Sequence, residues 1–299
     1  MKKYLIPCLA IMLLVSCDLS TGNAKQIANK IDKHIYKEAK KGIKKYADNL
    51  TERSQQRIQA SKRQPKSLQN FNEDTLIIAS IVNNRAEQLL TRTGYVTSYN
   101  ADLRIPNWVG WVLTDAHTSG TNKRKNSQFH EDYDVPTPRA THFDYIQSGY
   151  DRGHMCPAGD NKWDAQALDE TFLMTNICPQ NPNLNKGDWN ELEMKCRNWA
   201  NRMGKIYIVC GPILYNQKHK TIGKNRVTVP EAFFKVVLCL EGNPKGIGFI
   251  YKNQSGDKAL SSYVNSIDQV ERITGIDFFG NLPDDIETEV EASYDLRQW

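Results

Sequence analysis

The sequence predicts an α+β protein whose core is a mixed or antiparallel β-sheet, and three observations support this prediction. The composition, with 39% hydrophobic and 24% charged residues, is ordinary for a globular chain that can bury a sizeable core. Apolar runs at 205–210, 233–240 and 246–251 are typical of buried strands, and pairing among them would give an antiparallel sheet. Between 185 and 197, by contrast, polar or aromatic residues recur every four positions, which is typical of a helix: Asn185, Trp189, Glu193 and Arg197.

The first 17 residues are typical of an export signal. Lys2 and Lys3 precede an apolar run from Leu5 to Val15, which is too short to cross a bilayer comfortably as a mature helix. Leu14-Val15-Ser16-Cys17 resembles the bacterial lipobox, which implies cleavage before Cys17 and lipidation of that residue. The alternative is an ordinary secretory signal that ends nearby. We therefore expect residues 1–17 to be a lipoprotein signal peptide. The protein would be held at a membrane through Cys17, in the cell envelope and facing outside the cytoplasm, in the periplasm or at the cell surface.

Residues 18–74 are predicted to be a basic helical spacer. Isoleucine or alanine recurs every four residues, which gives a helix one narrow apolar stripe: Ile27, Ile31, Ile35, Ala39, Ile43 and Ala47. Residues 18–70 carry 13 Lys and Arg against five Asp and Glu, so the remainder of the chain is net acidic although the whole chain has a formal charge of +5. Two interpretations stay open, a simple spacer and a basic arm that gathers a polyanion or lies on anionic lipid.

Residues 75–299 have the sequence pattern of one globular domain. A helix is expected around 75–92, followed by strands near 95–99 and 108–114 and by a polar loop at 120–128. Ser266 is a candidate cap for a short helix that continues to Ile273, and Gly275 would end it.

The most informative stretch is Asp151-Arg152-Gly153-His154. Histidine exchanges protons near neutral pH, and Arg152 lies two residues before it, on the same side of an extended backbone. The glycine between them permits a close approach of backbone or ligand. Downstream, one helical stripe would carry an amide, a carboxylate and a guanidinium, at Asn185, Trp189, Glu193 and Arg197. A proton acceptor beside cationic groups is the chemistry of a phosphodiester-cleaving site.

This pattern resembles the DNA/RNA non-specific endonucleases of the ββα-metal type, a family that includes secreted bacterial sugar-non-specific nucleases and endonuclease G. The resemblance covers roughly residues 90–285. Its central residues are Asp151-Arg152-Gly153-His154, Thr171-Phe172, Asn176, Pro179-Gln180, Leu184-Asn185, Trp189, Leu192-Glu193 and Arg197. The resemblance implies a ββα-metal finger from about Tyr145 to Ala200.

The resemblance also implies a metal-dependent endonuclease with specific residue roles. His154 is the expected general base toward water. Asn185 is the expected ligand of one divalent cation, Mg²⁺ with Mn²⁺ as the alternative, because a single neutral ligand suits a cation that keeps most of its waters. Glu193 is expected to hold a metal-bound water, or else to be a surface carboxylate paired with Arg197. Arg152 and Arg197 are expected to bind nonbridging phosphate oxygens.

Supporting roles follow from the same resemblance. Asp151 and Asn176 are expected to orient Arg152 or the loop that carries Pro179-Gln180. The family has one more phosphate-contacting arginine, for which Arg124 and Arg139 are equal candidates. We expect DNA and RNA as substrates with little sequence preference, because no base-reading motif is visible and phosphate contacts carry no sequence information.

Two alternatives remain at the level of the sequence. Removal of Cys8 with the signal and use of Cys17 as the anchor would leave an odd number of cysteines, at 156, 178, 196, 210 and 239. A zinc site made by His154, Cys156, Cys178 and Cys196 is conceivable, but it lacks the usual short paired spacing. The alternative function is a lipid-anchored nucleic-acid-binding protein that has lost turnover. The oligomeric state cannot be predicted from the sequence.

Overall fold

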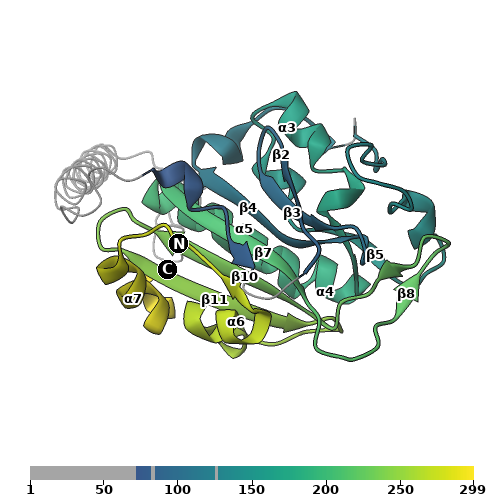
Figure 1. Ribbon diagram of the computed structural model, residues 1–299. Coiled ribbons are helices and arrows are strands. Elements are labelled where there is room, and N and C mark those ends of the chain that lie inside the picture. Colours follow the sequence, from purple (N-terminus) through teal and green to yellow (C-terminus); the bar gives the residue numbers. More distant parts are fainter. Residues whose placement is uncertain (1–71, 82–84, 125–126) are drawn as a thin grey trace, which may run out of the picture. The chain divides into compact units, whose positions relative to one another are not determined.

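A seven-stranded antiparallel sheet forms the centre of the computed structural model, which describes residues 72–81, 85–124 and 127–299. The strand order is β12-β11-β10-β7-β4-β3-β2 (Figure 1), and every neighbouring pair is antiparallel. The bounds are β2 (Gln88–Thr91), β3 (Val96–Asn100), β4 (Ile105–Thr114), β7 (Lys205–Ile213), β10 (Ala232–Cys239), β11 (Lys245–Lys252) and β12 (Val264–Asn265). The α+β class is confirmed. The five strands predicted from the sequence are also confirmed, as β3, β4, β7, β10 and β11.

The expected signal segment, its Cys17 and the spacer up to residue 71 lie outside the described residues. Within the described ranges, no helix combines the length and the apolar character that crossing a membrane would require.

The two faces of the sheet carry different helices. Along β7, Ile206 and Ile208 belong to one apolar cluster with residues of α5 (Asp188–Met203). Tyr207 and Val209 belong to a second cluster with residues of α6 (Ile267–Thr274) and α7 (Asp284–Ala292). Successive residues of a strand point to opposite faces, so α5 covers one face of the sheet and α6 and α7 cover the other. Figure 1 shows α6 and α7 beside β11.

The remaining elements are short. Two-stranded pairs are formed by β1 (Ser80–Ile81) with β13 (Ile276–Asp277) and by β8 (Thr221–Ile222) with β9 (Val227–Thr228). The helix α3 spans Ala165–Glu170. The 3₁₀ helices are η2 (Glu73–Thr75), η3 (Ala116–Ser119), η5 (His142–Tyr145), η6 (Ala158–Asp160), η7 (Met174–Asn176), η8 (Leu260–Ser262) and η9 (Leu296–Gln298).

The helix predicted over 75–92 is wrong for the described part of that range. A single 3₁₀ turn, η2, ends at Thr75, and Gln88–Thr91 forms the edge strand β2, paired with β3. Leu90 is buried, whereas Leu89 is 52% exposed, which is the alternation of a strand. Backbone pairing with β3 therefore outweighed an apolar spacing that was compatible with a helix.

The C-terminal helix α6 confirms its predicted signals. The Ser266 hydroxyl accepts a hydrogen bond from the backbone N–H of Gln269, whose side chain in turn accepts one from the backbone N–H of Ser266. Gly275 ends the helix in the left-handed region, with φ of 65°.

The expected finger is formed by two strands and the helical segment after them. Strand β5 (Asp151–His154) pairs antiparallel with β6 (Ile177–Gln180), and α4 (Pro182–Lys186) and α5 follow. The single stripe predicted from Asn185 to Arg197 is wrong in one respect, because Gly187, with φ of −98° and ψ of −114°, separates α4 from α5. Asn185 therefore belongs to a separate short helix.

Candidate active site

A cleft of about 480 Å³ lies where β5, α4 and α5 meet. Its lining brings together five of the predicted site residues, His154, Arg152, Asn185, Glu193 and Asp151. The other lining residues are Arg124, Phe129, Tyr150, Pro157, Lys186 and Asn190. Two of the predicted residues, Arg197 and Asn176, are not part of this lining. The cleft is thus rich in cationic and amide groups around one histidine.

The segment that carries His154 is held by Asn176. Asn176 is fully buried, and its side-chain oxygen accepts a hydrogen bond from the backbone N–H of Cys156 at 2.9 Å. Its amide group donates to the backbone oxygens of Cys156 at 2.9 Å and Thr171 at 2.8 Å. The Met155 N–H also donates to the backbone oxygen of Asn176. These bonds fix the chain immediately after His154, so Asn176 acts on the strand and does not reach the cleft.

Gly153 is required because Gln180 lies directly against it. A Cβ atom at position 153 would lie 2.3 Å from Oε1 of Gln180, whose side chain is fully buried. The glycine therefore permits the close packing of β5 against β6 that places Arg152 and His154 on the cleft side of the pair.

His154 lies in an apolar setting that keeps its imidazole neutral. The side chain is 7% exposed and lies against the rings of Phe129 and Phe172, with centroid distances of 5.2 Å and 5.1 Å. Burial, followed by the positive charge of Arg124, lowers the pKa of His154 to about 3. Its Nε2 atom has no hydrogen-bond partner among the described residues. A neutral imidazole at the wall of the cleft is suited to accept a proton from water.

Asn185 is oriented by Asp151. The Asn185 side-chain amide group donates a hydrogen bond to Oδ2 of Asp151 at 3.0 Å, and Nζ of Lys186 lies 3.3 Å from the same oxygen. Because the amide nitrogen of Asn185 is hydrogen-bonded to Asp151, the amide oxygen is the atom that can bind a ligand in the cleft. Such an oxygen is the kind of ligand that Mg²⁺ takes in proteins. Asp151 thus orients Asn185, whereas the sequence had suggested Arg152 or the loop at Pro179-Gln180 as its partner.

The arginines near the cleft divide into two groups. Arg152 lines the cleft, with its guanidinium 4.9 Å from the centroid of Phe129, and Arg124 lines it as well. Arg197 instead forms an ion pair of 2.8 Å with the buried carboxylate of Asp160. Arg139 donates to the backbone oxygen of Asp132 and does not line the cleft. Between the two candidates that the sequence left equal, Arg124 is the one at the cleft.

A buried lysine behind the cleft was not anticipated. Lys235, on β10, is fully buried, and its Nζ atom lies 5.1 Å from the ring centroid of Trp111 and 4.5 Å from that of Trp189. Against the cost of burial, the pKa of Lys235 is raised by Cys210 and Cys196 and, after them, by the carboxyl groups of Glu193 and Asp160. The only signal in the sequence is a single charged residue inside an otherwise apolar strand.

The charge of Lys235 affects Glu193. Burial raises the pKa of Glu193 to about 7, and the positive charge of Lys235 is the largest influence that opposes this rise. Asp160 and Arg197 act in opposite directions on the same carboxyl. Near neutral pH the carboxyl group of Glu193 therefore exists in both protonation states, and the charge of Lys235 favours the ionised one.

The cysteines do not form a metal site with His154. Cys156, Cys178, Cys196, Cys210 and Cys239 are all buried free thiols. Among the described residues, the group of three or more His, Cys, Asp or Glu side chains that could hold a metal ion contains neither His154 nor any cysteine. The zinc site considered from the sequence is therefore absent from the described structure.

Comparison with known families gives one match that decides the family. The model of the DNA/RNA non-specific endonuclease family matches residues 72–285. The chain belongs to this family. The matched region contains the whole cleft and all of the sheet. The family resemblance inferred from the sequence motif is therefore confirmed.

Individual relatives of this endonuclease-family chain are nucleases by name. "Nuclease EXOG, mitochondrial" of Xenopus laevis is 36% identical over 207 residues, which cover 64% of this chain and 58% of that protein. The chain thus spans less than two thirds of the length of that relative. "Endonuclease G, mitochondrial" of Bos taurus is 34% identical and is covered to 70%, with 65% of this chain aligned. "Nuclease" of Nostoc sp. is 33% identical over 69% of this chain and 78% of its own length.

A solved structure agrees in fold. The structure described as "Crystal structure of the EndoG/EndoGI complex: Mechanism of EndoG inhibition" matches this chain with a TM-score of 0.63 at 29% identity. The match covers 66% of this chain and 88% of that one. The family's ββα-metal fold is therefore shared by this chain.

Proposed function

We propose that the protein is a metal-dependent endonuclease that hydrolyses phosphodiester bonds of DNA and RNA with little sequence preference. The observation that carries the proposal is the convergence of a neutral histidine and an oriented amide oxygen in one cleft, at His154 and Asn185. Family membership and the names of the relatives support the reaction class.

In this proposal the chain's own residues bind phosphate and move a proton. Arg152 and Arg124 hold the nonbridging oxygens of the scissile phosphate, because guanidinium groups pair well with phosphate and remain charged. His154 then takes the proton of the water that attacks phosphorus. None of these groups reads a base edge, so the cleavage has little sequence preference.

The donor set of the cleft fits Mg²⁺, with Mn²⁺ as the alternative. Asn185 would bind the cation directly, and Glu193 would hold a water of its shell, which matches a cation that retains several waters. When bound there, the cation would supply Lewis-acid stabilisation of the leaving oxygen. Ionised Glu193 suits this role, which gives Lys235 an indirect part in maintaining the site.

A cleavage assay tests the proposed activity. With supercoiled plasmid and with RNA as substrates, we expect cleavage in Mg²⁺ that is abolished by EDTA and restored by excess Mg²⁺. Cleavage that is indifferent to EDTA would contradict metal dependence. Binding of both polymers without any cleavage would replace the enzyme by the alternative, an inactive nucleic-acid-binding protein.

We further propose the chain organisation expected from the sequence: a lipoprotein signal at 1–17, a basic spacer at 18–74 and the endonuclease domain at 75–299, with Cys17 anchored outside the cytoplasm. The start of the family match at residue 72 supports the last boundary. Labelled palmitate should be incorporated by the full chain in a bacterial host, and Cys17→Ser should abolish incorporation. Equal labelling of the two proteins would remove the anchor from the proposal.

A further inference from the structure

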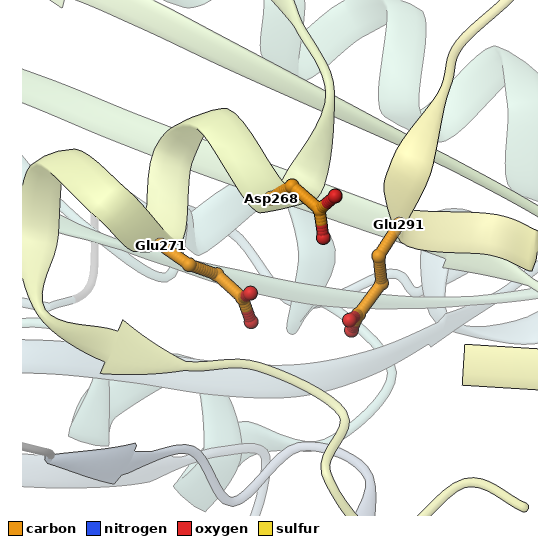
Figure 2. Close-up of side chains that lie close together, drawn as sticks. All are labelled: Asp268, Glu271 and Glu291. Carbon is orange, nitrogen blue, oxygen red and sulfur yellow. The ribbon is translucent and has the colours of Figure 1, made fainter. Parts of the chain in front are cut away.

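A second group of ionisable side chains lies on the opposite face of the sheet from α5. Asp268 and Glu271 stand one turn apart on α6, and Glu291 stands in the last turn of α7. Each can present one carboxylate oxygen, and these three oxygens lie within 4.8 Å of one another. Figure 2 shows the three side chains converging from the two helices. The packing of α6 beside α7 thus brings three acidic side chains together.

Glu291 is the member of this group that most needs a ligand. It is 6% exposed, and its Oε1 atom is buried with no hydrogen-bond partner among the described residues. Its carboxylate is directed toward Glu271 (Figure 2). A buried carboxylate normally has a donor or a cation as its partner, because burial without one is costly. In addition, an acidic group at the C-terminal end of a helix faces the negative end of the helix dipole.

No protein cation compensates this group within the described part of the chain. None of the ion pairs found there involves Asp268, Glu271 or Glu291. Among the described residues, the backbone N–H of Phe278 donates a hydrogen bond to Oε1 of Glu271 at 2.8 Å. This bond leaves the second oxygen of Glu271 available.

Neighbouring acids add to the negative charge. Burial, and then the charge of Glu271, raise the pKa of Glu291 to about 9, and Asp277 and Glu287 contribute in the same direction. Burial is also the main cause that raises the pKa of Glu271 to about 7. These shifts have the direction expected for carboxylates gathered in one place without a counterion.

We propose that Asp268, Glu271 and Glu291 form a binding site for a divalent cation of the calcium class, which links α6 to α7. Calcium is bound by carboxylate oxygens at about 2.3–2.6 Å in flexible geometry, so oxygens on opposite sides of it are about 4.6–5.2 Å apart. Three oxygens that lie within 4.8 Å of one another can therefore all contact one such cation. Mg²⁺ usually keeps several waters and binds only one or two carboxylates, and Zn²⁺ prefers nitrogen and sulfur ligands.

The position of the site defines its role. α6 and α7 both pack on β11 through apolar residues that include Ile267 and Val290, whose atoms lie against Gly246. A cation shared by the two helices would hold the C-terminal layer of the domain against the sheet. This function is separate from the cleft, which lies with α5 on the other face.

Calcium titration of the full chain, carrying Asn185→Ala to remove the proposed cation ligand of the cleft, tests the site. In millimolar Mg²⁺, isothermal titration calorimetry should detect one bound Ca²⁺ per chain. At a Ca²⁺ concentration about 100-fold above Kd, the Tm should rise by roughly 5–10 °C. If neither binding heat nor a Tm shift is found, the proposal is overturned.

Two glutamine variants in that background locate the cation. Glu291→Gln keeps the shape of the side chain but removes its charge, so Ca²⁺ affinity should fall at least about tenfold. Its Tm without Ca²⁺ should equal or exceed that of the parent, because the amide replaces a buried carboxyl group that has no partner and lies beside other acids. Glu289→Gln, an exposed change on the same helix, is the matched control and should bind Ca²⁺ as the parent does. Unchanged Ca²⁺ binding by Glu291→Gln, or an equal loss in both variants, would place the cation elsewhere and overturn the proposal.

Discussion

Replacing His154 by alanine is expected to reduce the rate of DNA and RNA cleavage by about 100- to 10,000-fold, the usual contribution of a general base. His154 is the neutral imidazole of the cleft, held between Phe129 and Phe172 with its pKa lowered to about 3. Binding of nucleic acid should persist, because Arg152 and Arg124 remain. Single-turnover cleavage and a separate binding measurement in EDTA distinguish the two effects.

A histidine outside the cleft provides the matched control. His117→Ala removes a ring that stacks on Trp163, and the cleavage rate should change by less than about twofold. Circular dichroism and Tm should confirm that both variants fold. A His154→Ala rate within tenfold of wild type would exclude this residue as the base.

The pH dependence supplies an additional readout for the same assignment. A base whose pKa is lowered to about 3 stays neutral until the pH falls to that value, so His154 should cause no loss of activity between pH 5 and 8. Glu193, with its pKa raised to about 7, gains a proton as the pH falls through that range. Any decline of wild-type activity toward pH 6 should therefore disappear in Glu193→Gln, although the overall rate of that variant is lower. A decline that persists in Glu193→Gln with a midpoint near the ordinary histidine pKa would contradict the lowered pKa of His154.

Asn185→Ala is expected to reduce cleavage at least about 100-fold in moderate Mg²⁺, because the cleft would lose the residue that we propose as its direct cation ligand. Raising the Mg²⁺ concentration should recover part of the rate if the remaining residues hold the cation weakly. The measurement is the initial rate as a function of Mg²⁺ concentration. Asn185 is the appropriate target because Asp151 fixes its amide nitrogen and so directs its oxygen.

The neighbouring Asn190 offers a close control for that experiment. It lines the same cleft from α5 but makes no hydrogen bond to Asp151 among the described contacts. Asn190→Ala should keep the wild-type Mg²⁺ dependence. If the two variants needed Mg²⁺ equally, the oriented amide at Asn185 would have no special role in holding the cation.

The sheet could largely be predicted from the sequence because its strands are long apolar runs. The residues of β10, Ala232–Cys239, are all buried, so the apolar character of all but Lys235 reflects the tertiary environment directly. At the edge of the sheet this relation fails. β2 buries one residue, Leu90, and its spacing is equally compatible with a helix, so the prediction over 75–92 followed the wrong period.

The site was predictable where one motif carries it and not where distant contacts do. Asp151-Arg152-Gly153-His154 reaches the cleft as a local unit, through β5. The Gly187 break was missed because a spacing of four does not reveal one distorted residue. The position of Lys235 relative to Glu193 depends on how β10 and α5 pack, and no local pattern specifies that contact. The choice of Arg124 over Arg139 required the folded chain for the same reason.

The buried cysteines bear on the compartments in which this fold can operate. All five are free, and burial raises the pKa of each, to about 12 for Cys196 and Cys210. Because the thiolate is the form that reacts with oxidants, thiols that are both inaccessible and protonated are slow to oxidise. The described fold therefore does not depend on a disulfide bond among these five cysteines. Once the domain is folded, these thiols are protected in reducing and in oxidising surroundings alike.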